Sequence, residues 1–97
     1  MSKSLRRLRV VVSGRVQGVW FRGSMVEQAR ALGVAGWVEN RPDGTVEAVV
    51  EGPDDAVERI LKWCHHGPSG ARVDDVTTSE EPPAGITGFD VTHGPSR

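Results

Sequence analysis

The residues most able to do chemistry lie in one segment, Gly14-Arg15-Val16-Gln17-Gly18-Val19-Trp20-Phe21-Arg22. Glycines relieve steric limits on the backbone, so successive N–H groups in such a segment can turn toward one point and bind an anion. A helix that begins at the end of the segment adds free N–H groups and partial positive charge. Arg22 then lies in the first turn, where its planar guanidinium can bind two oxygens of one phosphate. The segment therefore predicts a site for a single compact phosphate group.

The same spacing argues against a nucleotide site. No Gly-Lys-Ser/Thr ending follows the glycines, and the second Gly-x-x-Gly of a dinucleotide-binding turn is missing. The glycines alone also allow a simpler reading, in which they only turn the chain between a strand and a helix.

Asn40 is the second candidate, because we expect it at the end of a strand that can approach the end of the first strand. A carboxamide has no useful proton affinity, so it can orient a water or stabilise charge but cannot act as a base. The spacing equally allows Asn40 to be a turn residue with no catalytic role, since Asn is common beside Pro and Gly.

Hydrophobic periodicity and turn residues predict the elements that carry these groups. The expected elements are, in chain order, a strand over residues 6–13, a helix over 21–32 ended by Gly33, strands over 34–40 and 45–51 joined by a type I turn with a bulge at 41–44, a helix opened by 52–55 and stopped at 67–68, and strands over 71–78 and 86–92.

This order, β-α-β-β-α-β plus a final strand, predicts an α+β fold of the ferredoxin-like kind. Two helices would cover one face of a mixed, mostly antiparallel five-stranded sheet. We expect residues 1–97 to form one domain with short flexible tails at 1–5 and 93–97. Because this fold carries many unrelated activities, the function must be argued from the site.

Composition and charge narrow the function further. The formal net charge is −1, yet six of the twelve Lys and Arg residues lie in the first 22 positions, which hold no acidic residue. The overall balance argues against a general nucleic-acid binder. The basic residues Lys3, Arg6, Arg7 and Arg9 are either a tail with solvated strand residues or a local attraction for a small anion. The absence of a long apolar run and of a signal-peptide pattern, together with the single cysteine, predicts a cytoplasmic protein, and nothing demands more than a monomer.

Other polar residues are expected to be structural. Neighbouring side chains of Cys64-His65-His66 point about 100° apart on a helix, and no second ligand pair lies at zinc spacing, so no metal site is expected. Cys64 reads as a buried inert thiol. The acidic pairs at 74–75 and 80–81 read as solvated. Trp20 either packs in the core or shapes the mouth of the pocket.

At these residues the sequence resembles the acylphosphatase family. The family pattern Gly-x-Val-Gln-Gly-Val-x-Phe-Arg is matched over residues 14–22, and Gly-Trp-Val-x-Asn followed by Asp-Gly-x-Val is matched over 36–46. The resemblance covers about residues 6–92. One departure is Ala48, where many members have Gly.

The resemblance implies hydrolysis of the carboxyl–phosphate bond of small acyl phosphates to a carboxylate and inorganic phosphate, with no metal or organic cofactor. By motif position, Arg22 and Asn40 become the catalytic residues, Arg22 binding phosphate and Asn40 holding the attacking water. The phosphate-binding loop would comprise Val16, Gln17, Gly18, Val19, Trp20, Phe21 and Arg22. The implied partners are the substrate and phosphate, not nucleic acid or a membrane.

Three alternatives remain open on the sequence. The first is a non-catalytic phosphate-binding regulatory module on the same fold. The second is the acylphosphatase-like domain of a larger enzyme that uses carbamoyl phosphate, although no zinc-finger cysteines follow here. The third, an RNA-binding domain, is disfavoured, because it would need aromatic side chains on the central strands and a basic sheet face, whereas the strand over 45–51 carries Glu47 and Glu51.

Overall fold

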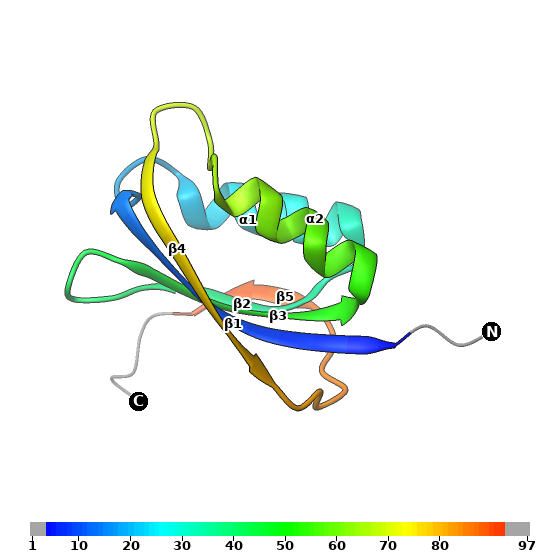
Figure 1. Cartoon of the computed structure of the whole chain (residues 1–97). Helices are drawn as coiled ribbons and strands as arrows, with labels where there is room; N and C mark the ends of the chain where they lie inside the picture. Colours follow the sequence, from blue (N-terminus) through cyan, green and yellow to red (C-terminus); the bar gives the residue numbers. More distant parts are fainter. Residues whose placement is uncertain (1–3, 93–97) are drawn as a thin grey trace.

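Two helices lie side by side on one face of a five-stranded sheet in the computed structural model, which describes residues 4–92 (Figure 1). The elements are β1 (Leu5–Arg15), α1 (Phe21–Leu32), β2 (Ala35–Asn40), β3 (Val46–Pro53), α2 (Asp54–Cys64), β4 (Arg72–Glu81) and β5 (Phe89–Val91). The strands are ordered β4-β1-β3-β2-β5, and only β5 pairs in parallel, with β2. The predicted ferredoxin-like α+β fold is confirmed.

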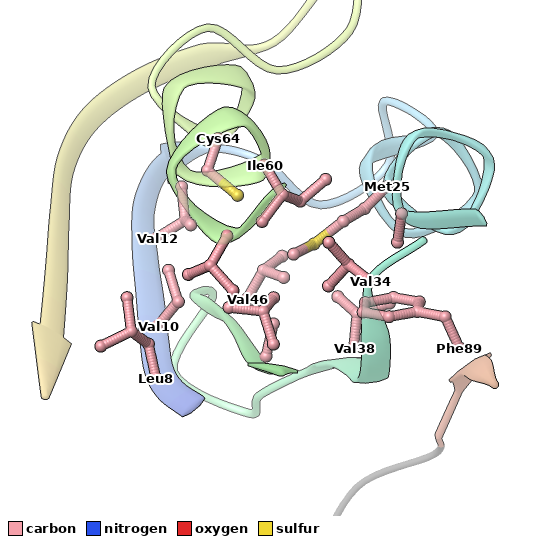
Figure 2. Packing of buried hydrophobic residues seen from close by; sticks show 14 of the residues in the cluster. Leu8, Val10, Val12, Met25, Val34, Val38, Val46, Ile60, Cys64 and Phe89 are labelled. Atoms are coloured by element: carbon pink, nitrogen blue, oxygen red, sulfur yellow. The ribbon is translucent and has the colours of Figure 1, made fainter. Parts of the chain in front are cut away.

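The core fills the space between the helices and the sheet. Alternate residues of β1 and β3 face the helices, as the period of two along a strand requires. Figure 2 shows Met25 and Ile60 pointing from the two helices toward the sheet. The largest fully buried side chains are Phe21, Phe89, Leu8, Met25, Ile60 and seven valines. One buried layer thus fixes how both helices sit over the strands.

Local sequence signals set the ends of both helices. Helix α1 has the predicted bounds, and Gly33 ends it at φ 75°. The Gly33 N–H donates to the Arg30 carbonyl and the Val34 N–H to that of Ala29, so the freed carbonyls are satisfied. Helix α2 starts after Pro53 and carries two aspartates in its first turn, where they complement the helix dipole. Neither helix in the described part of the chain is long and apolar enough to span a membrane.

All five strands differ from their predicted bounds, β2 and β3 by only one or two residues at an end. Strand β1 includes Leu5, expected in the tail, and also Gly14 and Arg15, expected in the loop. It extends because Leu5 pairs with Pro53 of β3, and because β4 pairs with Gly14 and Arg15 beyond a bulge after Ser13. At Gly14, which has φ 123°, an added Cβ would lie 2.1 Å from the Arg72 carbonyl oxygen, so only glycine fits. Of the predicted tails, residues 1–3 and 93–97 lie outside the described residues.

Strand β4 runs on to Glu81, whereas β5 holds three residues instead of the seven predicted. The reason lies in Glu51, which is 3% exposed. Its carboxylate accepts hydrogen bonds from the backbone N–H groups of Ala84, Gly85 and Ile86, at 3.0, 2.7 and 3.3 Å. Residue 86, expected in the last strand, is therefore held by a side chain instead of a strand partner.

The sheet face opposite the helices carries charge pairs. Arg7 bonds to Glu51 and Glu81, while Arg9 bonds to Glu47 and Glu81. Hydrogen bonds from both arginines hold the pKa of Glu81 below its ordinary value. Glu81 was expected to be solvated, which is wrong, because it is half-buried between two cations.

The N-terminal arginines are thus paired within the fold. Arg6, next along β1, bonds to Asp54, Glu58 and Glu80. Arg6, Arg7 and Arg9 are therefore neither plainly solvated nor free for a small anion, because carboxylates of α2, β3 and β4 pair with them. Lys3 lies outside the described residues.

The Glu51 carboxylate makes the free energy of unfolding depend on pH. Burial alone would raise its pKa, but the hydrogen bonds from Ala84, Gly85 and Arg7 outweigh burial and lower it. A carboxyl whose folded pKa is lowered stabilises the fold above its unfolded pKa, and that contribution is lost as pH falls through the folded pKa. We expect Glu51→Gln to reduce the free energy of unfolding at neutral pH by about 1.5–3 kcal/mol.

The measurement is urea denaturation from neutral pH into the acid range. Glu51→Gln should also flatten the loss of stability on acidification. Glu27→Gln on the exposed side of α1 is the control and should change stability by less than about 0.5 kcal/mol. An unchanged acid limb in Glu51→Gln would contradict the role given to this carboxylate.

Candidate active site

The loop between β1 and α1 places its backbone amides in an open turn. It starts at Val16, which is 1% exposed and anchors the loop in the core. Gly18 and Trp20 both have positive φ, 76° and 66°. Positive φ at such positions turns successive N–H groups to one side, the arrangement of an anion nest. Among the described residues, no hydrogen bond uses the backbone N–H groups of residues 17–20.

Helix α1 begins directly after this loop. Trp20 is its N-cap, and no side chain caps the helix. The N–H groups of Phe21, Arg22 and Gly23 lie in the first turn, where no carbonyl of the same helix can reach them. No acidic residue lies in that turn, so its partial positive charge is not neutralised locally. Phe21 anchors the helix start by packing on Trp63, with ring centroids 5.1 Å apart.

Gln17 does not face the pocket with its side chain. Its Nε2 donates to the carbonyl oxygens of Arg41 and Thr45, at 2.8 and 2.9 Å. These carbonyls belong to the turn between β2 and β3, at the same end of the sheet as the loop (Figure 1). The predicted tight turn is present there, since the Gly44 N–H donates to the Arg41 carbonyl and Gly44 has φ 93°. Gln17 therefore fixes the loop against the turn that follows Asn40.

Asn40 is the last residue of β2 and lies opposite Val46 of β3. It shares the helix-covered face with Gly36 and Val38, because residues two apart point the same way. Its Oδ1 is the one buried side-chain nitrogen or oxygen of the described residues for which no hydrogen-bond partner is found. A buried carbonyl oxygen without a partner is costly, so such an atom indicates a place for a ligand or a water.

One pocket brings these groups together. It has a volume of about 590 Å³. Its lining comprises Val16, Gly18, Val19, Trp20, Phe21, Arg22, Gly23, Asn40 and Val91. Six of the seven predicted loop residues are among them, Gln17 being the exception, and Arg22 and Asn40 both line the same space. Trp20 lies at the mouth of this pocket and not in the core, since its side chain is 71% exposed.

Arg22 differs from the other cations near the chain start. Arg6, Arg7 and Arg9 each contact two or more carboxylates, but among the described residues no ion pair involves Arg22 or Arg15. Arg22 is half-buried in the pocket, whereas Arg15 is exposed at the end of β1. A cation without a carboxylate partner beside free N–H groups is suited to an anion.

Two lining residues were not singled out from the sequence. Gly23 follows Arg22 directly, so its position was available from the motif. Val91 comes from β5, and only the parallel pairing of β5 with β2 places it here. No local signal in the sequence could have shown that.

The residues set aside as structural stay outside the pocket. Cys64 is buried, and burial raises the pKa of its thiol to about 12, so it is inert. His65 and His66 are exposed at the end of α2. Within residues 4–92, no group of three or more His, Cys, Asp or Glu is arranged to hold a metal ion.

Comparison with known proteins identifies the family of the chain. The family model described as Acylphosphatase matches residues 8–91. An acylphosphatase of Rubrobacter xylanophilus is 55% identical over 91 residues, which cover 93% of this chain and 83% of that protein.

Two solved acylphosphatase structures have the same fold as this chain. The acylphosphatase structure from Coxiella burnetii superposes with a TM-score of 0.89 at 35% identity, covering 95% of this chain and 99% of that one. The acylphosphatase crystal structure from Bacillus subtilis gives a TM-score of 0.85 at 34% identity, covering 92% and 99%.

The Gln17 contacts generate a stability prediction. In Gln17→Ala the carbonyls of Arg41 and Thr45 lose their side-chain donor, and we expect the free energy of unfolding to fall by about 1–2 kcal/mol. Faster hydrogen exchange at the Gly44 N–H should accompany the loss. Gln28→Ala, an identical change at an exposed position of α1, should stay within about 0.5 kcal/mol of the parent. Equal effects of the two changes would show that the bridge carries no stability.

Proposed function

The chain belongs to the acylphosphatase family, and from this premise we propose how its pocket performs the family's reaction. The reaction is hydrolysis of the carboxyl–phosphate bond of an acyl phosphate to a carboxylate and inorganic phosphate. A non-catalytic binding module on the same fold is not favoured, because the curated relatives are acylphosphatases.

One observation carries the assignment of roles. The buried Oδ1 of Asn40, which has no hydrogen-bond partner among the described residues, shares a pocket with Arg22 and the start of α1. The pocket thus pairs groups that attract an anion with an acceptor that can take a hydrogen bond from water. Hydrolysis of a phosphoryl compound needs these two functions at adjacent positions.

The phosphoryl group binds at the loop and helix start. The N–H groups of residues 16–22 donate to its oxygens, and the Arg22 guanidinium donates to two of them. Because these donors are held in place before the substrate arrives, they can stabilise the charge that spreads over the phosphoryl oxygens during the reaction.

Asn40 holds the nucleophilic water. Its Oδ1 accepts a hydrogen bond from the water, which leaves an oxygen lone pair free to attack phosphorus. The new P–O bond forms as the bond between phosphorus and the carboxyl oxygen breaks, and the carboxylate leaves with the electron pair. A carboxylate is a good leaving group, so no strong general acid is needed.

The proton of the water passes to a phosphoryl oxygen of the substrate. The nine lining residues include no Asp, Glu, His, Cys or Lys that could accept it as a general base. The products are then the carboxylate and a protonated phosphate, and the atoms balance without a further group. A kcat profile that shows an essential enzyme base near neutral pH would contradict this route.

We also propose that the reaction needs no metal or organic cofactor and no nucleic-acid or membrane partner. Residues 1–97 would act as one domain and as a monomer in the cytoplasm. The pairing of Arg6, Arg7 and Arg9 with carboxylates supports the absence of a nucleic-acid partner, since it offsets the charge of the most basic stretch of the chain.

Asn40→Ala tests the water-binding role. We expect the parent protein to hydrolyse benzoyl phosphate in the presence of a chelator, followed by ultraviolet absorbance. In the variant kcat should fall by about a hundredfold or more, because an oriented water contributes at least that much. Binding of inorganic phosphate, measured by calorimetry, should be retained. Loss of phosphate binding instead would make Asn40 structural.

Arg22→Lys tests the phosphate clamp. An ammonium cannot replace the planar fork of a guanidinium, so kcat/KM should fall by about a hundredfold or more although the charge is kept. Arg15→Lys is the same change at an exposed cation at the end of β1, outside the pocket, and should leave kcat/KM within about twofold of the parent. Near-normal kcat/KM in Arg22→Lys would refute the clamp.

A further inference from the structure

The pocket is larger than its phosphate requires. Its volume of about 590 Å³ lies within the range of sites that hold whole small molecules, about 300–1,000 Å³. Arg22, Asn40 and the amides of the α1 start occupy the polar part. The remaining lining is apolar, with Val19, Trp20 and Val91 among its side chains. The space beyond the phosphoryl group is therefore bordered by apolar surface.

Trp20 is exposed to solvent, whereas most large apolar side chains are buried. Its side chain is 71% exposed, although indole is among the largest apolar groups. It is also the only non-glycine among residues 4–92 with positive φ, a conformation that glycine or asparagine adopts more easily. Neither the core nor the helix cap benefits, because the side chain makes no capping hydrogen bond. A residue that is strained and exposed at a pocket mouth indicates function.

Gly23 fixes where the indole lies. A Cβ at position 23 would come within 2.4 Å of Cε2 and 2.5 Å of Cζ2 of Trp20. The ring therefore rests directly on the backbone of the first turn of α1, and glycine is the residue that leaves room for it. Because both residues line the pocket, the indole forms one wall of it, and its contact with Gly23 fixes the position of that wall beside the phosphate site.

We propose that the Trp20 indole binds the acyl group and gives this chain a preference for acyl phosphates with a planar aromatic acyl group over small aliphatic ones. This rests on the proposed function and deepens it. The phosphate donors bind every acyl phosphate alike, so selectivity must come from contacts of the acyl group. An indole face stacks on a planar apolar group and gains little from a single methyl.

The experiment compares kcat/KM for benzoyl phosphate and acetyl phosphate. Trp20→Gly removes the ring at a position whose φ suits glycine, so the fold should be retained. We expect the ratio of kcat/KM for benzoyl phosphate to kcat/KM for acetyl phosphate to fall about fivefold. Trp20→Phe, which restores a flat ring, should recover most of the loss. Equal losses for both substrates, or none for either, would overturn the proposal.

Two further variants sharpen the test. Gly23→Ala keeps the indole but displaces it, and it should reduce the preference for benzoyl phosphate in the same direction as Trp20→Gly. Among residues 4–92 the other exposed large apolar side chain is Leu5, 54% exposed on β1 and outside the pocket, and Leu5→Ala should leave the preference unchanged. A preference that survives in Gly23→Ala, or that falls in Leu5→Ala, would count against Trp20.

A binding measurement separates this inference from the proposed reaction. Phenylphosphonate and methylphosphonate differ only in the group beside the phosphoryl oxygens, and calorimetry needs no turnover. We expect phenylphosphonate to bind more tightly to the parent and the two to become similar in Trp20→Gly. Absence of hydrolysis would refute the reaction and leave this difference in place. Equal binding of both to an active parent would refute the Trp20 assignment alone.

Discussion

The site depends on one bridge, the pair of hydrogen bonds from the Gln17 carboxamide to the carbonyls of Arg41 and Thr45. The anion-binding amides belong to the segment before α1, and the carboxamide of Asn40 belongs to the end of β2. Nothing in either segment alone sets their separation. Gln17 joins the two as a second donor to carbonyls that already accept backbone N–H groups within the turn, so the phosphate donors and the water acceptor keep one spacing. Precise spacing is what a reaction with a good leaving group needs from its enzyme.

The elements predicted best were those defined by local signals. Helix α1 carries its apolar period and its terminating Gly33 within a dozen residues, so its bounds could be read directly. The limits of β1, β4 and β5 could not, because they depend on which strand lies beside which. Strand β1 continues through Gly14 only because β4 pairs with it there, and β5 is short because Glu51 takes the amides of residues 84–86. Residues near these strand ends in the sequence give no indication of such pairings across the sheet.

The site divides in the same way. Arg22 and Asn40 were found by motif and by their places at element ends, and the pocket holds both. The direction of the Gln17 side chain and the contribution of Val91 required the tertiary structure. For Trp20, the sequence left core and pocket mouth open, because an aromatic residue beside a glycine loop suits either. The ion pairs of Arg6, Arg7 and Arg9 could not be predicted for a related reason, because their carboxylate partners lie far along the chain.

The uncovered sheet face has a consequence for behaviour on heating. Charges alternate across it in an unbroken series, Arg41, Glu47, Arg9, Glu81, Arg7 and Glu51, each joined to the next by an ion pair. Removing water from ions becomes less unfavourable as temperature rises, so a linked series of this kind strengthens relative to hydrophobic packing in warm conditions. Added salt acts the other way, by screening the exposed members. The layer that lacks helices is thus the part of the molecule whose cohesion responds most to the surrounding medium.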